Sequence, residues 1–369
     1  MSDYTGRPDR ASRGLSPHTG RTPWTRVIAG VVAATIAILG LGISTPARAD
    51  EPPRFVSTWK TDELSAGSSS DNQVTLPLVA DGDYDFVVDW GDSSTSTITT
   101  ETDPQTTHTY GSAGTYTITI TGTISGFRFN NSGDRRKLTG VSEWGPLAFG
   151  AAAGGQFYGA QNLTITAADA PSLSGTTDLS NAFNGATTLT GGVAGWNVSG
   201  VTTMRSMFQG ATDFNADIAA WNVANVTTMR SMFQGATDFN ADIAAWNVAN
   251  VTTMRSMFQG ANGFDRDLGG WNVQNVADMT DMFAGGDTVG LSLDNYDSLL
   301  EGWAQQVVQP GVDFYAGDET YYNPKAELPF AQARQTLIDD YAWTITDAGA
   351  AGVPARPNPP SATPGSNEM

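Results

Sequence analysis

The sequence predicts an α+β protein made of an N-terminal β-sandwich, a solenoid in which each 25-residue coil has a short strand and a short helix, and an α/β C-terminal cap. Three observations support this fold class. Short alternating strands separated by turn residues fill residues 55–124. Residues 202–224 recur unchanged at 227–249, and units of this length stack because one unit cannot bury its apolar face alone. Helical spacing of apolar residues follows the last copy.

Residues 1–49 have the pattern of a secretory signal peptide. An arginine-rich start precedes an uncharged apolar run from Val27 to Ile43, and Ala47-Arg48-Ala49 has the small-x-small form of a cleavage site. We therefore expect a secreted or cell-surface protein. An uncleaved membrane anchor is the alternative, because the run is just short of bilayer-spanning length. The sequence has no cysteine for a lipid anchor and no sorting motif.

Residues 50–130 are predicted to form the β-sandwich. Tyr116, Ile118 and Ile120 alternate with threonines, which is typical of a half-buried strand. Two motifs, Val88-Asp89-Trp90-Gly91-Asp92 and His108-Thr109-Tyr110, resemble those of the polycystic-kidney-disease type of immunoglobulin-like domain. Domains of that family are mostly spacers or binding modules of exported proteins, so the resemblance implies such a role here.

An acidic cluster in this domain is a weak candidate for a calcium site, because Ca²⁺ takes six to eight oxygen ligands from closely spaced carboxylates. Its members are Asp81, Asp83, Asp85, Asp89 and Asp92. The alternative, which we favour, is that they form tight turns and a solvated strand face, since Asp and Gly are common turn residues. We therefore predict no metal site.

The repeats are expected over residues 131–286, with degenerate first copies and regular copies at 196–286. Apolar residues at helical spacing predict a helix of about two turns in each copy. In one copy these residues are Val226, Met229, Met232, Phe233 and Ala236. The segment just before them matches the apolar offsets of a leucine-rich-repeat core, with Val226 in the usual asparagine position.

Stacking of the copies assigns each column of equivalent residues to the core or to the surface. The Trp, Met and Phe columns are predicted core, because a fully buried Met or Phe contributes about 1.5–3 kcal/mol. The exposed columns provide the candidate binding residues. These are Arg205, Arg230, Arg255, Gln209, Gln234, Gln259, Asp213 and Asp238. Either Arg and Asp eight residues apart neutralise each other locally, or the rows form a multivalent strip whose weak contacts add.

The repeat units resemble those of BspA-family leucine-rich-repeat surface proteins of bacteria. The resemblance rests on Trp221-Asn-Val, on the segment from Val226 to Ala236, and on Phe239-Asn-Ala-Asp-Ile. Residues 287–349, the predicted cap, are similar to the C-terminal end of that family, and 350–369 read as a Pro-rich flexible tail. The resemblance implies an exported, non-enzymatic bacterial protein, and some family members bind host matrix proteins.

Composition excludes several function classes. The formal net charge of −19 repels phosphate backbones, so nucleic acid is not an expected partner. The chain has no cysteine, and His108 is its only histidine after the signal, which rules out a cysteine nucleophile and a multi-histidine metal site.

We therefore expect no catalytic residue, no cofactor, and a repeat solenoid that mediates adhesive or other protein-protein interactions. Host matrix proteins and other cell-surface proteins are the expected partners. Binding of a cell-wall glycan is the alternative. A carboxylate-dependent glycoside hydrolase is a less favoured one, because near-identical aspartates in every copy provide no pair with distinct pKa values.

Overall fold

The computed structural model describes residues 51–151, 153–285, 290–322 and 330–350. They belong to one compact unit, Glu51–Met369. The predicted signal peptide and nearly all of the predicted tail lie outside the described residues. Within those ranges, no helix is long and apolar enough to cross a membrane.

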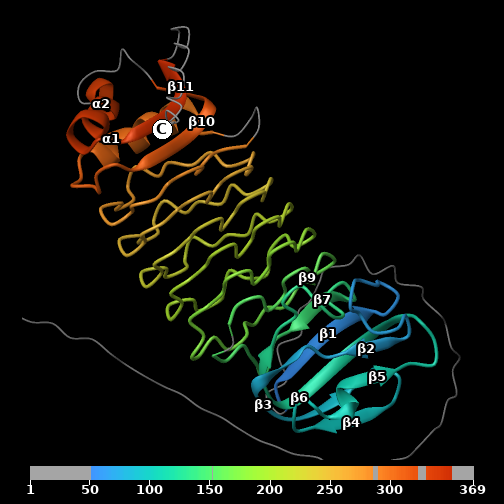
Figure 1. The fold of residues 1–369 in the computed structure, drawn as a ribbon. Helices are drawn as coiled ribbons and strands as arrows, with labels where there is room; N and C mark the ends of the chain where they lie inside the picture. Colours follow the sequence, from blue (N-terminus) through green and yellow to red (C-terminus); the bar gives the residue numbers. More distant parts are fainter. Residues whose placement is uncertain (1–50, 152, 286–289, 323–329, 351–369) are drawn as a thin grey trace, which may run out of the picture. The chain divides into compact units, whose positions relative to one another are not determined.

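The N-terminal part of the unit is a seven-stranded sheet (Figure 1). Its strands run in the order β4-β3-β6-β1-β7-β9, and β8 pairs with β6. Their bounds are β1(Arg54–Lys60), β3(Leu78–Asp89), β4(Thr95–Ile98), β6(Thr115–Phe127), β7(Leu138–Glu143), β8(Leu147–Ala148) and β9(Thr164–Ile165). A second, two-stranded sheet joins β2(Gln73–Thr75) to β5(Thr107–Thr109), which directly follows the 3-10 helix η1(Pro104–Thr106).

The alternation seen in the sequence explains the burial of this sheet. Phe86 and Val88 of β3 and Ile118 and Ile120 of β6 are buried, while the residues between them are exposed or half-buried. Val88 lies opposite Ile120 across the antiparallel pair, so the inward faces of the two strands coincide.

The repeats form a stack of coils joined by backbone hydrogen bonds between residues about 25 positions apart (Figure 1). Between two central coils, the N–H groups of Met204, Ser206, Phe208 and Gly210 donate to carbonyl groups of the following coil, at distances of 2.7–3.1 Å. Single parallel bridges join Thr203, Thr228 and Thr253 in a continuous row. Each coil therefore pairs part of its backbone N–H and carbonyl groups with those of its neighbours.

The predicted fold class is wrong, because the described residues of the coils contain no helix. The described residues are mostly sheet and turn, with only two α-helices of 12 residues each, both outside the repeats. In the segment predicted as helix, Met229, Ser231 and Phe233 donate their N–H groups to the next coil, so these groups cannot form helical bonds. Ser231 also has a φ of 55°, a left-handed conformation that a right-handed helix excludes.

Successive turns explain why the pattern looked helical. The N–H of Met232 donates to the carbonyl of Met229, and the N–H of Ala236 donates to that of Phe233. Each of these turns joins residues three positions apart, so apolar side chains return to one side at a spacing that also occurs in a helix.

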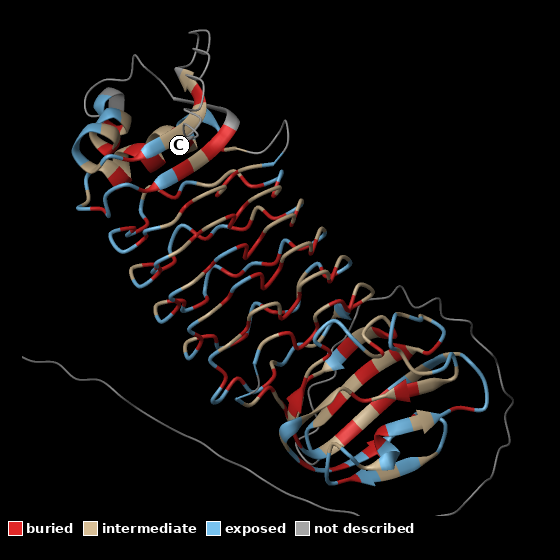
Figure 2. Ribbon diagram, in the orientation of Figure 1, coloured by how far each residue is buried: buried red, intermediate tan, exposed pale blue. Residues whose placement is uncertain are grey.

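Buried side chains form ladders through the stack, which confirms the predicted core columns. Each central Trp donates its indole N–H to a carbonyl 28 residues earlier, as from Trp221 to Val193 and from Trp246 to Ile218, both at 3.1 Å. Phe208 and Phe233 stack with ring centroids 5.7 Å apart. The Met columns are fully buried. Figure 2 shows buried and exposed residues alternating along each coil.

An asparagine ladder is also present, one position before the one that the leucine-rich-repeat pattern suggests. The amide of Asn225 donates to the carbonyl of Ser199, Asn250 to Ala224, and Asn275 to Ala249, at 2.7–2.8 Å. Val226, in the usual asparagine position, is buried in the core.

The C-terminal segment contains α1(Leu293–Ala304), β10(Asp313–Tyr322), α2(Phe330–Tyr341) and β11(Thr344–Ala350), with β10 parallel to β11. The α/β cap predicted for this segment is not what the described residues show, because the segment continues the rows of the stack itself. Phe314 of β10 bridges to Met279, and Trp303 of α1 takes the next Trp position by donating to the carbonyl of Leu268. Gln309 likewise extends the asparagine ladder by donating to Gln274.

Candidate binding surface on the repeats

The Arg row, consisting of Arg205, Arg230 and Arg255, is positioned by the backbone hydrogen bonds of the stack. The carbonyls of these residues accept the N–H groups of Asn181, Ser206 and Ser231 in the preceding coils. The neighbouring Met204 and Ser206 are buried, whereas the side chain of Arg205 is exposed. Because paired chains lie about 4.8 Å apart, the Arg row places one guanidinium group per coil along the stack.

Two members of the Arg row have no acidic partner among the described residues. No carboxylate lies within ion-pair distance of Arg205 or Arg230, so the predicted pairing of Arg and Asp within a coil is absent. Arg255 lies 3.6 Å from Asp281, with about 40% of each side chain exposed. Our sequence interpretation missed this partner, although Asp281 occupies the position of Ser256 one copy later.

The Gln row, consisting of Gln209, Gln234 and Gln259, is half-buried and bonded to itself. Asn184 donates to Gln209 at 3.1 Å, and Gln209 donates to Gln234 at 2.7 Å, after which Gln234 donates to Gln259. This amide ladder holds neighbouring coils in register. Its members therefore have fewer free donors and acceptors for a ligand than the Arg row has.

Two acidic rows lie beyond the turn at Gly210 and Gly235. The first Asp row is Asp213 and Asp238, which are exposed and accept hydrogen bonds from Thr212 and Thr237. The second Asp row is Asp217, Asp242 and Asp267. These residues are exposed, and one oxygen of each accepts the N–H of the residue two positions later.

The acidic cluster of the N-terminal sheet divides into two groups. Asp81, Asp83 and Asp85 are exposed on β3. Asp89 accepts the N–H of Gly91, and Asp92 accepts the N–H of Ser94 and a hydrogen bond from His108, which is typical of tight turns. In the described part of the chain, no three acidic or histidine side chains are placed to hold a metal ion.

Asp92 stabilises its turn in a way that depends on pH. Hydrogen bonds from Ser94 lower the pKa of Asp92 from 3.8 to about 2, and the bond from His108 acts in the same direction against partial burial. Because the folded-state pKa is the lower one, this stabilisation is complete above pH 4 and is lost as the pH falls towards 2.

We therefore predict that Asp92→Asn lowers the free energy of unfolding by about 1 kcal/mol at pH 7, after allowance for solvent screening. The difference from wild type should shrink between pH 4 and pH 2, as measured by urea unfolding at each pH. A difference that stays constant down to pH 2 would contradict this assignment.

Asp92, Ser94 and His108 lie close together but do not form a catalytic triad. The ring atom Nε2 of His108 is 2.8 Å from Asp92 and 3.5 Å from the Ser94 hydroxyl, so one nitrogen faces both groups. A triad needs the acid and the nucleophile on different ring nitrogens. The ring of His108 also stacks on Trp90, with centroids 4.8 Å apart, which favours a packing role.

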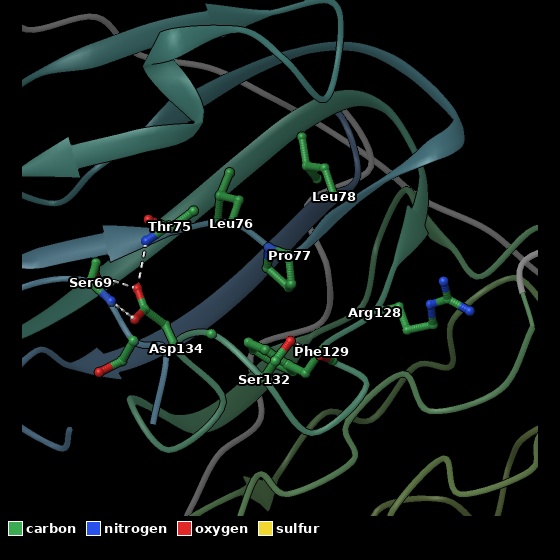
Figure 3. A pocket seen from close by; sticks show the side chains of 12 residues that line it. Ser69, Thr75, Leu76, Pro77, Leu78, Arg128, Phe129, Ser132 and Asp134 are labelled. Atoms are coloured by element: carbon green, nitrogen blue, oxygen red, sulfur yellow. Dashed lines mark hydrogen bonds between the residues drawn. The ribbon is translucent and has the colours of Figure 1, made fainter. Parts of the chain in front are cut away.

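A pocket of about 390 Å³ lies beside the loop before β2 (Figure 3). Its lining includes Ser69, Thr75 and Asp134, and the Asp134 carboxylate accepts hydrogen bonds from the Ser69 N–H, the Ser69 hydroxyl and the Thr75 N–H, all at 2.7 Å. Lys137 is fully buried and lies 3.3 Å from Asp134. Its ammonium group donates to the carbonyls of residues 69, 70 and 73. These polar groups are used in holding the loop, so the pocket is not our candidate site.

Residues 177–296 match the family model described as "Mycoplasma protein of unknown function, DUF285". The match covers the regular copies and ends within α1. No curated protein and no solved structure matches the chain.

Proposed function

We propose that this chain is an exported bacterial protein whose repeat stack binds other proteins at or outside the cell surface, without catalysis. Resemblance to BspA-family leucine-rich-repeat surface proteins supports this role, and the matched DUF285 family is related to BspA-like repeat proteins. The export pattern in residues 1–49 supports the location.

The observation that carries the proposal is the Arg row. Arg205 and Arg230 occupy the same position in adjacent coils, are exposed, and have no acidic partner in the described residues. The backbone hydrogen bonds between coils fix the spacing of Arg205 and Arg230 in the unbound protein, which reduces the entropy cost of binding. A partner with several acidic groups would meet several equal contacts, and such contacts add through effective concentration.

A copy-number series tests the proposal. Deleting residues 202–226, or duplicating them, removes or adds one whole coil and preserves the register, because 202–224 and 227–249 are identical. We expect the dissociation constant for coated collagen or laminin to fall severalfold with each added coil. The measurement is biolayer interferometry with the full chain.

A matched series in which Arg230, Arg205 where it is present, and the equivalent Arg of any added coil are all replaced by Gln is the control, and its binding should no longer depend on copy number. A dissociation constant that does not change with the number of coils in the unsubstituted series would contradict multivalent binding. Binding to purified peptidoglycan but to neither protein would favour the glycan alternative.

A further inference from the structure

Two adjacent coils each contribute one Arg of the Arg row and one Asp of the second Asp row that form no ion pair among the described residues. Arg205 and Asp217 belong to one coil, and Arg230 and Asp242 belong to the next. All four side chains are exposed. At the end of each row the third member is engaged within the chain, since Arg255 pairs with Asp281 and Asp267 accepts a hydrogen bond from Ser298.

The carboxylates of the second Asp row are only partly satisfied. Oδ1 of Asp217 accepts the N–H of Ala219 at 3.1 Å, and Oδ1 of Asp242 accepts that of Ala244 at 3.0 Å. Among the described residues, Oδ2 of each accepts no hydrogen bond and lies in no ion pair. Each row thus presents two charged groups that the chain itself does not neutralise.

The spacing of these groups selects among possible partners. Both rows repeat once per coil, at about 4.8 Å. Side chains on one face of an extended peptide recur about every 6.6 Å. This distance differs from the spacing of about 4.8 Å between coils, so a peptide that meets one residue of a row is displaced from the next. The phosphates of one DNA strand advance by about 3.4 Å, and the net charge of −19 repels them. A second stack of the same coils has the same period at every step.

We propose that the repeat stack pairs with a second copy of this chain, with Arg205 and Arg230 of one copy against Asp217 and Asp242 of the other. Equal periods let both ion pairs form at once, because the backbone hydrogen bonds already fix both rows. The net negative charge of the two copies opposes their approach. At physiological ionic strength that repulsion is screened beyond about 8 Å, while contact pairs are screened less.

This inference rests on the proposed binding role of the Arg row and names one partner for it. Two full-chain variants test it. The Arg-row variant carries Arg205→Glu and Arg230→Glu, and the Asp-row variant carries Asp217→Lys and Asp242→Lys. Arg205 and Arg230 are exposed, so the Arg-row variant should keep the melting temperature of the wild type within a few degrees. The Asp-row variant also loses the hydrogen bonds from Ala219 and Ala244, so Asp217→Asn with Asp242→Asn, whose amide oxygens can still accept them, is its control and should weaken association as well.

Sedimentation velocity over a concentration series is the measurement. We expect the wild type to form a faster species as concentration rises, and each variant alone to show at least a tenfold weaker association. An equimolar mixture of the variants should regain association, because the Arg row of one then meets the Asp row of the other. A wild type that stays monomeric at all concentrations would overturn the inference, as would a mixture that behaves like the separate variants.

The outcome is independent of the copy-number assay. Binding to collagen or laminin without self-association would overturn only the homophilic pairing. Self-association without binding to the coated proteins would support the pairing between copies and contradict the proposed binding to collagen or laminin.

Discussion

Trp246→Ala is expected to lower the free energy of unfolding by about 3–5 kcal/mol, the range for removing a large buried aromatic side chain. The side chain of Trp246 is 3% exposed and packs 6.4 Å from the ring of Phe233, centroid to centroid. Its indole N–H donates to the Ile218 carbonyl in the preceding coil, which also accepts the N–H of Trp221, so the substitution removes one of the two hydrogen bonds to this carbonyl. Calorimetry and urea unfolding followed by circular dichroism would measure the loss.

Two further variants separate packing from hydrogen bonding. Trp246→Phe keeps most of the buried ring and loses the bond, and because Trp221 still donates to the Ile218 carbonyl, the lost bond should cost about 0.5–1.5 kcal/mol. Ala245→Ser changes an exposed neighbour and should lie within about 0.5 kcal/mol of the wild type. A loss below 1 kcal/mol for Trp246→Ala would show that the Trp ladder does not hold the coils together.

Lys137→Met is expected to destabilise the protein by about 3–5 kcal/mol, because it leaves the buried carboxylate of Asp134 without its counter-charge. Three carbonyl groups also lose the donor that gathers them around the ammonium group. Burial lowers the pKa of Lys137, and Asp134 opposes that shift. The measurement is urea unfolding at pH 7.

The matched control is Lys60→Met, the same substitution in an ion pair with Glu63 at 2.6 Å whose side chains are 44% and 37% exposed, and it should have little effect. The double variant Lys137→Met/Asp134→Asn should lose less stability than the sum of its single variants, since removal of both charges leaves none uncompensated. Additive losses would contradict a coupled pair.

The sequence predicted which side chains of the repeats are buried, because this depends only on period. A 25-residue repeat places Trp221 over Trp246 and Met229 over Met254 in any stacked structure, and these columns are buried. The same argument placed Arg205 and Arg230 at the surface, where the structure has them. The alternation of the N-terminal strands similarly reflects a local property of extended chain.

The buried pair of Asp134 and Lys137 was not predicted. Both lie in a charged segment, Asp134-Arg135-Arg136-Lys137, which is typical of an exposed turn. Only the loop formed by residues 69–75, distant in sequence, supplies the carbonyls and N–H groups that make their burial tolerable.

The sequence by itself therefore determined the period of the stack, its core columns and its exposed rows, because each of these follows from spacing along the chain. The tertiary structure decided the conformation of the coil and the pairing of its charges. Apolar residues three and four positions apart fit a helix and a series of turns equally well. The choice was made by where the backbone N–H groups found acceptors: in the next coil for Met229, Ser231 and Phe233, and not within their own segment.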